Sequence, residues 1–168
     1  MTEKLPTAMD DEFDDLFTIE LEDCDAYKLP EGVLYIARSD QFMSMGFIEI
    51  EPGKESSKKS RTVTGYFKQT EGQSAFRIFD KNGSVKEMIL KKGDKLKIDA
   101  NHDYIIKNDG EENSVVFWKF NGDVFEAFET LRKTLEKIDA KARPKSGYKE
   151  LYKQHVEARK SFFDRFKK

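Results

Sequence analysis

The sequence is poor in the side chains that most often carry covalent or metal chemistry. Cys24 is the single cysteine among 168 residues, and only two histidines occur. One cysteine excludes an intramolecular disulfide, and it also excludes a cluster of thiolate metal ligands within one chain. Its neighbours Asp23 and Asp25 would raise rather than lower the pKa of the thiol, which argues against a cysteine nucleophile.

The sequence also lacks a long apolar run and a large excess of either charge. No stretch approaches the roughly 20 apolar residues that a membrane span requires, and no cationic segment followed by an apolar run marks a signal peptide. We therefore expect an intracellular protein of the cytoplasm or nucleus, without a membrane contact. The net charge of −2 gives the chain as a whole no nucleic-acid signature.

Surface charge and aromatic side chains, in contrast, are abundant. Charged residues make up 37% of the chain and aromatic residues 12%, with fourteen phenylalanines, which is a globular composition and not a disordered one. The length indicates one domain with extensions. Residues 1–25 are acidic and the C-terminal end is lysine-rich, which is typical of solvated termini, although an interaction tail has the same composition. We expect an acidic flexible tail at 1–15.

Short apolar runs with period-2 spacing occupy most of the chain after this tail. Turn formers separate them, among them Pro52-Gly53 and Asn82-Gly83, and Asn-Gly readily takes the positive φ angles of a tight hairpin turn. Short strands at this spacing indicate an all-β sandwich or barrel. The predicted strands cover residues 17–21, 33–37, 46–51, 63–68, 74–79, 85–90, 96–98, 104–107 and 114–120.

The pattern changes to a helical one after residue 120. Apolar residues from Val124 to Ile138 repeat at 4-3-4-3 spacing, which predicts a helix of about five turns, and Asp123 with Glu126 can form a capping box. A second amphipathic helix is predicted over 148–166. Neither helix can cover its apolar stripe alone, so each must pack on the strands, on the other helix or on a partner.

One stretch, Gly93 to Asn108 (GDKLKIDANHDYIIKN), resembles the second sequence motif of the cupin superfamily. The segment MGFIEIEPGKESSKKSRTVTGYFKQTEGQSAFRIF has the cadence of the first motif, a strand ending in Pro-Gly, a polar loop and a strand. The resemblance covers Met45 to Phe120. It implies a mainly β fold in which 16–120 form a cupin-like β-barrel or jelly roll (double-stranded β-helix), followed at 121–168 by two C-terminal amphipathic α-helices.

The residues that hold a metal in such proteins are replaced here. Tyr104 stands where the second motif has a histidine, Gly65 stands where the first motif has a glutamate, and the two remaining histidine positions fall near Lys58 to Arg61. Catalytic metals need converging imidazole and carboxylate ligands, and His102 neighbours the ligand position without filling it. We therefore expect no bound metal, no cofactor and no catalytic residue, and a protein more scaffold than enzyme.

Within the superfamily, residues 101–108 (NHDYIIKN) and the apolar strand that follows are similar to the terminal cupin domain of the centromere protein C family. That likeness implies a metal-free cupin that forms homodimers at kinetochores. The basic, tryptophan-containing nucleosome-binding motif of that family is absent, and two C-terminal helices are not part of its usual ending.

Three functions are consistent with the sequence. The first is a non-catalytic homodimeric scaffold, chromatin-associated by family likeness, that recruits a protein partner through its C-terminal helices; its predicted interface residues are Phe117, Trp118, Phe120, Phe128, Leu131, Leu135 and Ile138. The second is a metal-independent binder of a small anionic or sugar-like molecule, or an isomerase with a tyrosine acid; its predicted cavity residues are Tyr104, Tyr66, Lys58, Lys59 and Arg61. The third is nucleic-acid binding through the same basic loop.

Overall fold

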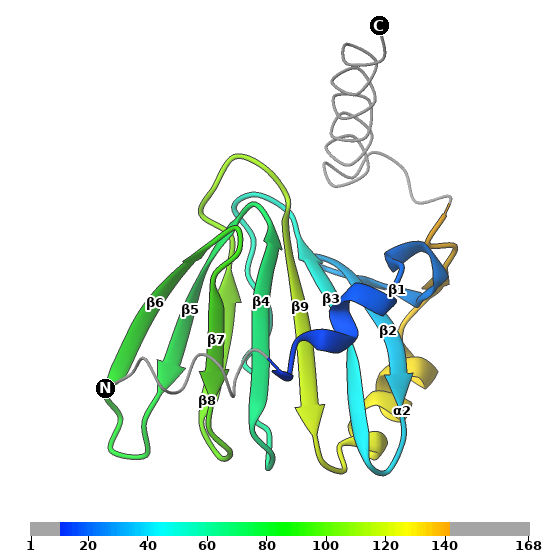
Figure 1. Ribbon diagram of the computed structural model, residues 1–168. Coiled ribbons are helices and arrows are strands. Elements are labelled where there is room, and N and C mark those ends of the chain that lie inside the picture. Colours follow the sequence, from blue (N-terminus) through cyan, green and yellow to red (C-terminus); the bar gives the residue numbers. More distant parts are fainter. Residues whose placement is uncertain (1–10, 142–168) are drawn as a thin grey trace, which may run out of the picture.

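The computed structural model describes residues 11–141, in which β-strands are the main secondary structure (Figure 1). The strands are β1 (Asp25–Leu29), β2 (Gly32–Ser39), β3 (Met43–Ile50), β4 (Gly65–Glu71), β5 (Gln73–Phe79), β6 (Val85–Lys91), β7 (Lys95–Ile98), β8 (Asp103–Lys107), β9 (Ser114–Asn121) and β10 (Lys137–Ile138). Two 3-10 helices, η2 (Asp14–Thr18) and η3 (Leu21–Asp23), precede β1, and the α-helix α2 (Phe125–Thr134) follows β9. The predicted mainly β fold is confirmed.

The strands form two separate sheets. One has the order β10-β1-β2-β3-β9-β4-β7 and the other β6-β5-β8, and all neighbours are antiparallel. In the described part of the chain no strand pairing joins the two sheets, so they form a two-layer sandwich. Of the two arrangements that the sequence allowed, sandwich or barrel, the structure has the sandwich. Every predicted strand from residue 33 onward is present.

The large sheet buries both of its faces, and β9 shows why. All seven residues Ser114–Phe120 are buried. Since successive side chains of a strand point to opposite faces of the sheet, both faces must be covered at this strand. On the inner face, Val116, Trp118 and Phe120 join the core between the two sheets. On the outer face, Val115 and Phe117 join a second core. A glycine is needed opposite the indole, since a Cβ at Gly46 would lie 2.8 Å from the Trp118 ring.

The outer core is covered by the chain before β1, where the prediction was wrong. The expected strand at 17–21 is absent, and η2 and η3 occupy this region instead. Period-2 spacing misled because Phe17 is 79% exposed while Leu21 is buried, so the apolar residues here do not share one face of a strand. Phe13 is also buried, with its ring 6.2 Å from Phe117 and 6.4 Å from Tyr66.

The predicted boundary of a flexible tail at residue 15 therefore falls inside a packed segment. The Lys119 side chain, 9% exposed, reaches this segment and donates to Asp15 Oδ2 at 2.9 Å and to the Glu12 carbonyl at 3.1 Å. The acidic residues at this point bind β9 and not the basic loop at 54–61. Residues 1–10 lie outside the described part of the chain.

The helix after β9 is shorter than predicted. It ends at Thr134, and Lys137–Ile138 forms β10 by pairing Ile138 with Ala26 and Lys137 with Tyr27 of β1. The free edge of β1 offers backbone hydrogen bonds that a longer helix would leave unused, and this edge ends the helical pattern. The 121–168 extension is thus partly sheet. The second predicted helix, at 148–166, lies outside the described residues.

Candidate functional site

A small cavity lies in the inner core, beside α2. Its volume is about 30 Å³, which is room for about two water molecules. Apolar side chains from both sheets and from α2 form most of its wall, and four polar side chains complete it. The lining residues are Leu29, Leu34, Ile48, Lys59, Arg61, Phe67, Tyr104, Ile106, Trp118, Phe120, Phe128 and Leu131.

The loop between β3 and β4 supplies the two cationic residues of the wall. It runs beside β8 like an irregular extra strand, because Lys59 N donates to Tyr104 O at 2.8 Å and Tyr104 N donates back to Lys59 O at 3.0 Å. Asn101 N also donates to Arg61 O. This extended pairing places Lys59 and Arg61 in the wall of the cavity, although the Lys59 ammonium itself donates to Ser57 Oγ at 3.1 Å on the exposed side. Lys58 points away, with its ammonium 3.9 Å from Asp103 and 4.2 Å from the Phe79 ring centroid.

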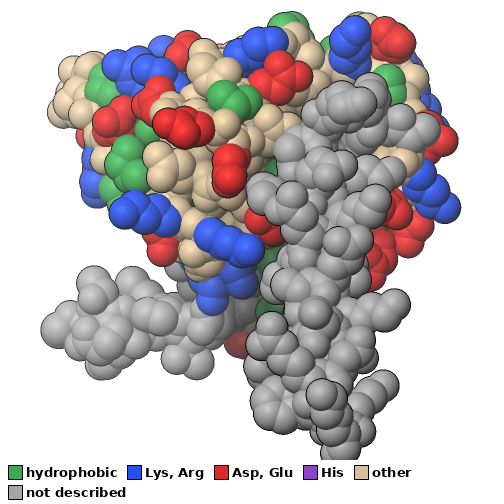
Figure 2. All heavy atoms as spheres, turned by 90° about the horizontal axis from the view of Figure 1, so that it is seen from above, with side chains coloured by type: hydrophobic (Ala, Val, Ile, Leu, Met, Phe, Trp, Pro, Cys, Tyr) green, Lys and Arg blue, Asp and Glu red, His purple; other side chains and the backbone are tan. Residues whose placement is uncertain are grey.

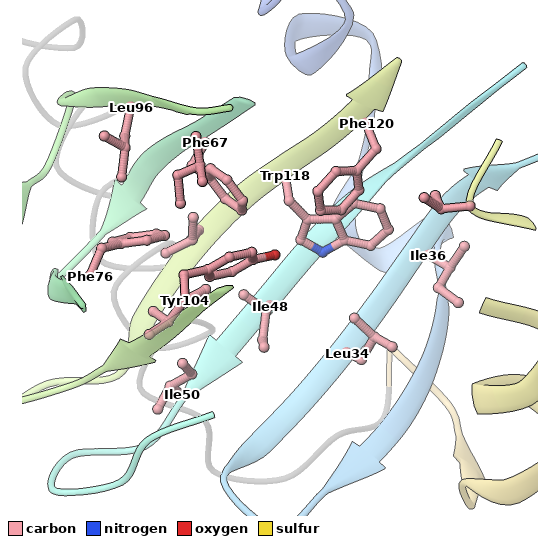
Figure 3. Packing of buried hydrophobic residues seen from close by; sticks show 14 of the residues in the cluster. Leu34, Ile36, Ile48, Ile50, Phe67, Phe76, Leu96, Tyr104, Trp118 and Phe120 are labelled. Atoms are coloured by element: carbon pink, nitrogen blue, oxygen red, sulfur yellow. The ribbon is translucent and has the colours of Figure 1, made fainter. Parts of the chain in front are cut away.

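Tyr104 of β8 brings a hydroxyl into the cavity. Its ring packs edge-on against Phe67 at 5.4 Å, and Figure 3 shows the oxygen pointing toward Trp118. Burial raises the pKa of Tyr104 to about 12, against the opposing effect of the neighbouring Arg61 guanidinium. The hydroxyl therefore keeps its proton at neutral pH and can act as a hydrogen-bond donor.

Arg61 lies over aromatic rings instead of a carboxylate. Its guanidinium carbon is 5.4 Å from the Phe120 centroid and 5.3 Å from the Phe128 centroid, which is cation–π distance. Its Nε is buried and has no hydrogen-bond partner in the described part of the chain. Lys59 adds a second positive charge to the wall; burial, followed by the repulsion of Arg61, lowers the pKa of Lys59.

Trp118 of β9 carries a third donor. The indole stacks on Phe128 at 4.7 Å with nearly parallel planes, and the side chain is buried. None of the described residues provides a hydrogen-bond partner for its Nε1. Leaving such a donor unpaired costs about 1–3 kcal/mol, so an acceptor placed in the cavity would recover that energy. The polar part of the wall thus consists of donors and contains no carboxylate.

The donor set of this cavity does not suit a metal ion. Cations such as iron, manganese and zinc need imidazole, thiolate or carboxylate ligands, and the wall offers none. Among residues 11–141 no group of three His, Cys, Asp or Glu side chains could hold a metal ion. His102 lies outside the cavity, with its Nε2 3.5 Å from Asp80. Burial, then Asp23 and Asp25, raises the pKa of Cys24 to about 12, so its thiol is not activated.

The structure brings together three of the five predicted cavity residues, Tyr104, Lys59 and Arg61. It places Lys58 on the surface and Tyr66 on the outer face of the large sheet, against Phe13. The sequence reasoning missed Trp118 as a cavity residue. The alternation within SVVFWKF could have grouped Trp118 with Phe120, but not shown which face of β9 turns inward.

The residues predicted to form a dimer interface pack within the chain itself. Phe117 lies in the outer core, while Trp118, Phe120 and Phe128 are buried in the inner one. The remaining three are partly buried, Leu131 and Leu135 against the inner core and Ile138 against the outer core. The aromatic residues are therefore not available to a partner in this structure.

The chain is similar to known proteins in its fold, but it matches none of the known families by sequence. No protein-family model and no curated protein matches the chain.

Among residues 11–141 no helix is both long enough and apolar enough to cross a membrane.

Several solved structures of oxalate decarboxylases do match. The formate complex of the Lactobacillus farciminis enzyme has a TM-score of 0.58 at 18% identity, over 64% of this chain and 33% of that chain. The Bacillus subtilis enzyme, which has Mn(II) centres, has a TM-score of 0.57 at 18% identity, over 61% and 29%. A single-residue variant of the same enzyme gives 0.58 at 12%, over 72% and 31%.

The chain spans about a third of the length of these proteins. At such identities the likeness establishes the fold, which is the cupin fold of the oxalate decarboxylases. The cupin fold expected from the sequence is thereby supported.

Proposed function

We propose that the inner cavity binds a small organic anion, a carboxylate of few carbon atoms. The observation that carries this proposal is the buried Trp118 Nε1, which has no acceptor among residues 11–141. Arg61 Nε is also buried and lacks an acceptor among the described residues. The Tyr104 hydroxyl, which lines the same cavity, keeps its proton and can donate it to a ligand in a hydrogen bond. A site made of donors and positive charge suits a ligand that only accepts hydrogen bonds, and hydrogen bonds to a charged acceptor are the stronger ones.

The size of the cavity and the fold support the same class of ligand. Room for about two water molecules matches a carboxylate group more closely than a sugar. Oxalate decarboxylases are among the structures that share the fold, one of them in complex with formate. Most of the wall around the donors is apolar, and a low local dielectric strengthens each electrostatic contact with a bound anion.

Binding rather than catalysis is the activity that these residues favour. The wall lacks the ligands for a metal, so a metal-dependent decarboxylation does not fit the side chains of this cavity. A tyrosine acid, as an isomerase would need, works best with a pKa near the operating pH, whereas the pKa of Tyr104 is raised to about 12. No carboxylate or imidazole lines the cavity to serve as its base.

The chain contains its own probe for this proposal, since Trp118 is its single tryptophan. We expect formate, acetate or oxalate to change its fluorescence in a saturable way, with inorganic phosphate as a larger anion for comparison. Arg61→Gln should weaken binding about 10- to 100-fold, because hydrogen bonds to charged groups contribute about 1.5–3 kcal/mol. The matched control is Lys58→Gln, which removes a charge from the same loop outside the cavity.

The proposal is wrong if none of these anions binds at about 100 mM, where even a millimolar Kd would give saturation. It is also wrong if Arg61→Gln and Lys58→Gln weaken binding equally, since that result would indicate a general charge effect.

A second proposal concerns self-association as a homodimer, at a different place from the one expected. β6 is the end strand of the three-stranded sheet, and it exposes Val85 at 50% and Ile89 at 53%. An exposed apolar edge strand is a template for pairing with another chain. Sedimentation should show a dimer at micromolar concentration that Val85→Lys dissociates; a monomeric wild-type protein would contradict this proposal.

Association with nucleic acid or chromatin finds less support. Lys58 is near Asp103, Lys54 pairs with Glu51 at 2.9 Å, and Arg61 turns inward, so this loop presents no basic patch. Acidic and basic side chains are interspersed on the face seen in Figure 2. A protein partner bound through the second predicted helix would involve residues outside the described part.

A further inference from the structure

The inner cavity has a groove beside it on the surface. This groove has a volume of about 260 Å³ and lies between the β3–β4 loop and the start of α2. Of the described residues, Arg61 alone lines both the cavity and the groove. The other residues of the groove are Ser60, Thr62, Asp123, Val124, Glu126 and Ala127.

The two sides of Arg61 differ in what they offer a guanidinium. On the inner side it has the rings of Phe120 and Phe128, and its Nε lacks a partner. On the outer side the groove is lined by the carboxylates of Asp123 and Glu126, both exposed residues. A guanidinium forms its strongest hydrogen bonds with carboxylates, so the groove offers this side chain partners that its inner position lacks.

We propose that Arg61 is a gate, closed when its guanidinium lies over Phe120 and Phe128 and open when it pairs with Asp123 and Glu126 in the groove. The open position joins the cavity to the groove and admits the small anion; on return, Arg61 holds the anion from the surface side. This inference rests on the proposed function for its ligand, but the gate itself can be measured without one.

The gate predicts a change in the association rate of the anion that is opposite to the change expected from charge alone. Asp123→Asn with Glu126→Gln removes the charges that hold the open position, so opening becomes rarer. The association and dissociation rates of the anion should then both fall about two- to fivefold, the range expected for an exposed ion pair, while Kd stays nearly constant. Without a gate, removal of two negative charges near the path would speed the association of an anion.

The substitutions are chosen to leave the fold intact. Asp123 Oδ1 accepts a hydrogen bond from Phe125 N at the start of α2, and asparagine is an equally good residue at a helix start. The matched control is Glu136→Gln with Asp139→Asn, which removes two exposed charges after α2 that line neither cavity nor groove. Arg61→Ala provides the permanently open form.

The first measurement is quenching of Trp118 fluorescence by acrylamide in the full chain, without any anion. We expect the quenching constant to fall about two- to fivefold in the Asp123→Asn/Glu126→Gln variant, to rise in Arg61→Ala and to stay unchanged in the control. The second measurement is stopped-flow binding of formate or oxalate, followed by the same fluorescence.

Each outcome separates the two proposals. Unchanged or increased quenching in the Asp123→Asn/Glu126→Gln variant overturns the gate, whether or not an anion binds. Faster anion association in that variant also overturns it. If quenching falls as expected but no anion binds, the gate stands as a way into the cavity and the proposed function is refuted.

Discussion

Removal of the Phe13 ring, in the variant Phe13→Ala, tests whether the chain before β1 is part of the folded domain. The ring is 2% exposed and packs edge-on against Tyr66 and Phe117, with the Lys95 ammonium 5.5 Å above it. Burial of a phenylalanine contributes about 1.5–3 kcal/mol, and each aromatic pair adds about 0.5–1.5 kcal/mol. Phe13→Ala should therefore lower the free energy of unfolding by about 3–5 kcal/mol, less if the segment detaches and water fills its place.

The same segment provides the control. Phe17 is 79% exposed, and its one described ring contact is with the Lys68 ammonium at 5.5 Å. Phe17→Ala should cost no more than about 0.5–1 kcal/mol, the value of an exposed cation–π contact. Urea unfolding of both variants measures the difference. Equal effects, or a loss below about 1 kcal/mol for Phe13→Ala, would refute the packed segment and support the flexible tail expected from the sequence.

Three further predictions concern the sheet and its charges. Gly46→Ala should cost more than about 3 kcal/mol in urea unfolding, since the new Cβ would lie 1.9 Å from the Tyr35 carbonyl oxygen; a loss below about 1 kcal/mol would mean that the strand shifts easily. The hydrogen bond from Arg132 lowers the pKa of Asp25, so this pair stabilises the fold above the unfolded pKa of about 3.9 and is lost as pH falls through the lower folded value. Asp25→Asn should thus reduce stability at pH 7 by less than about 1 kcal/mol because solvent screens the pair, and the difference should shrink as pH falls below about 3.9; a difference that does not change with pH would contradict the ion pair. The pKa of Tyr104 is raised to about 12, so its contribution is complete below the unfolded pKa of about 10 and is lost as pH rises through the folded value. The stability difference between wild type and Tyr104→Phe should shrink in that window, and a constant difference would refute the buried, protonated hydroxyl.

The elements that the sequence predicted correctly are those whose signal is local. Val85 to Leu90 follows an Asn-Gly turn, and the structure has β6 in that place. Tyr104, Lys59 and Arg61 were grouped through the motif resemblance, and the structure joins them through the pairing of the loop with β8. The absence of metal ligands at those positions was also visible in the residue types alone.

The predictions that failed depended on contacts far apart in the sequence. The residues after Thr134 repeat like a helix, but the edge of β1 takes Lys137 and Ile138 into the sheet. Trp118 was assigned to an interface because the aromatic residues and the amphipathic helices would otherwise expose a large apolar patch. Instead, Trp118 is buried in the inner core, where its indole stacks on Phe128 of α2.

The sequence by itself determined that this chain builds short antiparallel strands and that no imidazole or carboxylate occupies the positions where related folds bind a metal. Only the tertiary structure decided which side chains meet in the cavity. In SVVFWKF both faces of the strand are apolar, so its alternation cannot tell inside from outside. The register of β9 against β3 and β4 turns Trp118 inward and Phe117 outward, because side-chain direction follows from the position of the strand in the sheet.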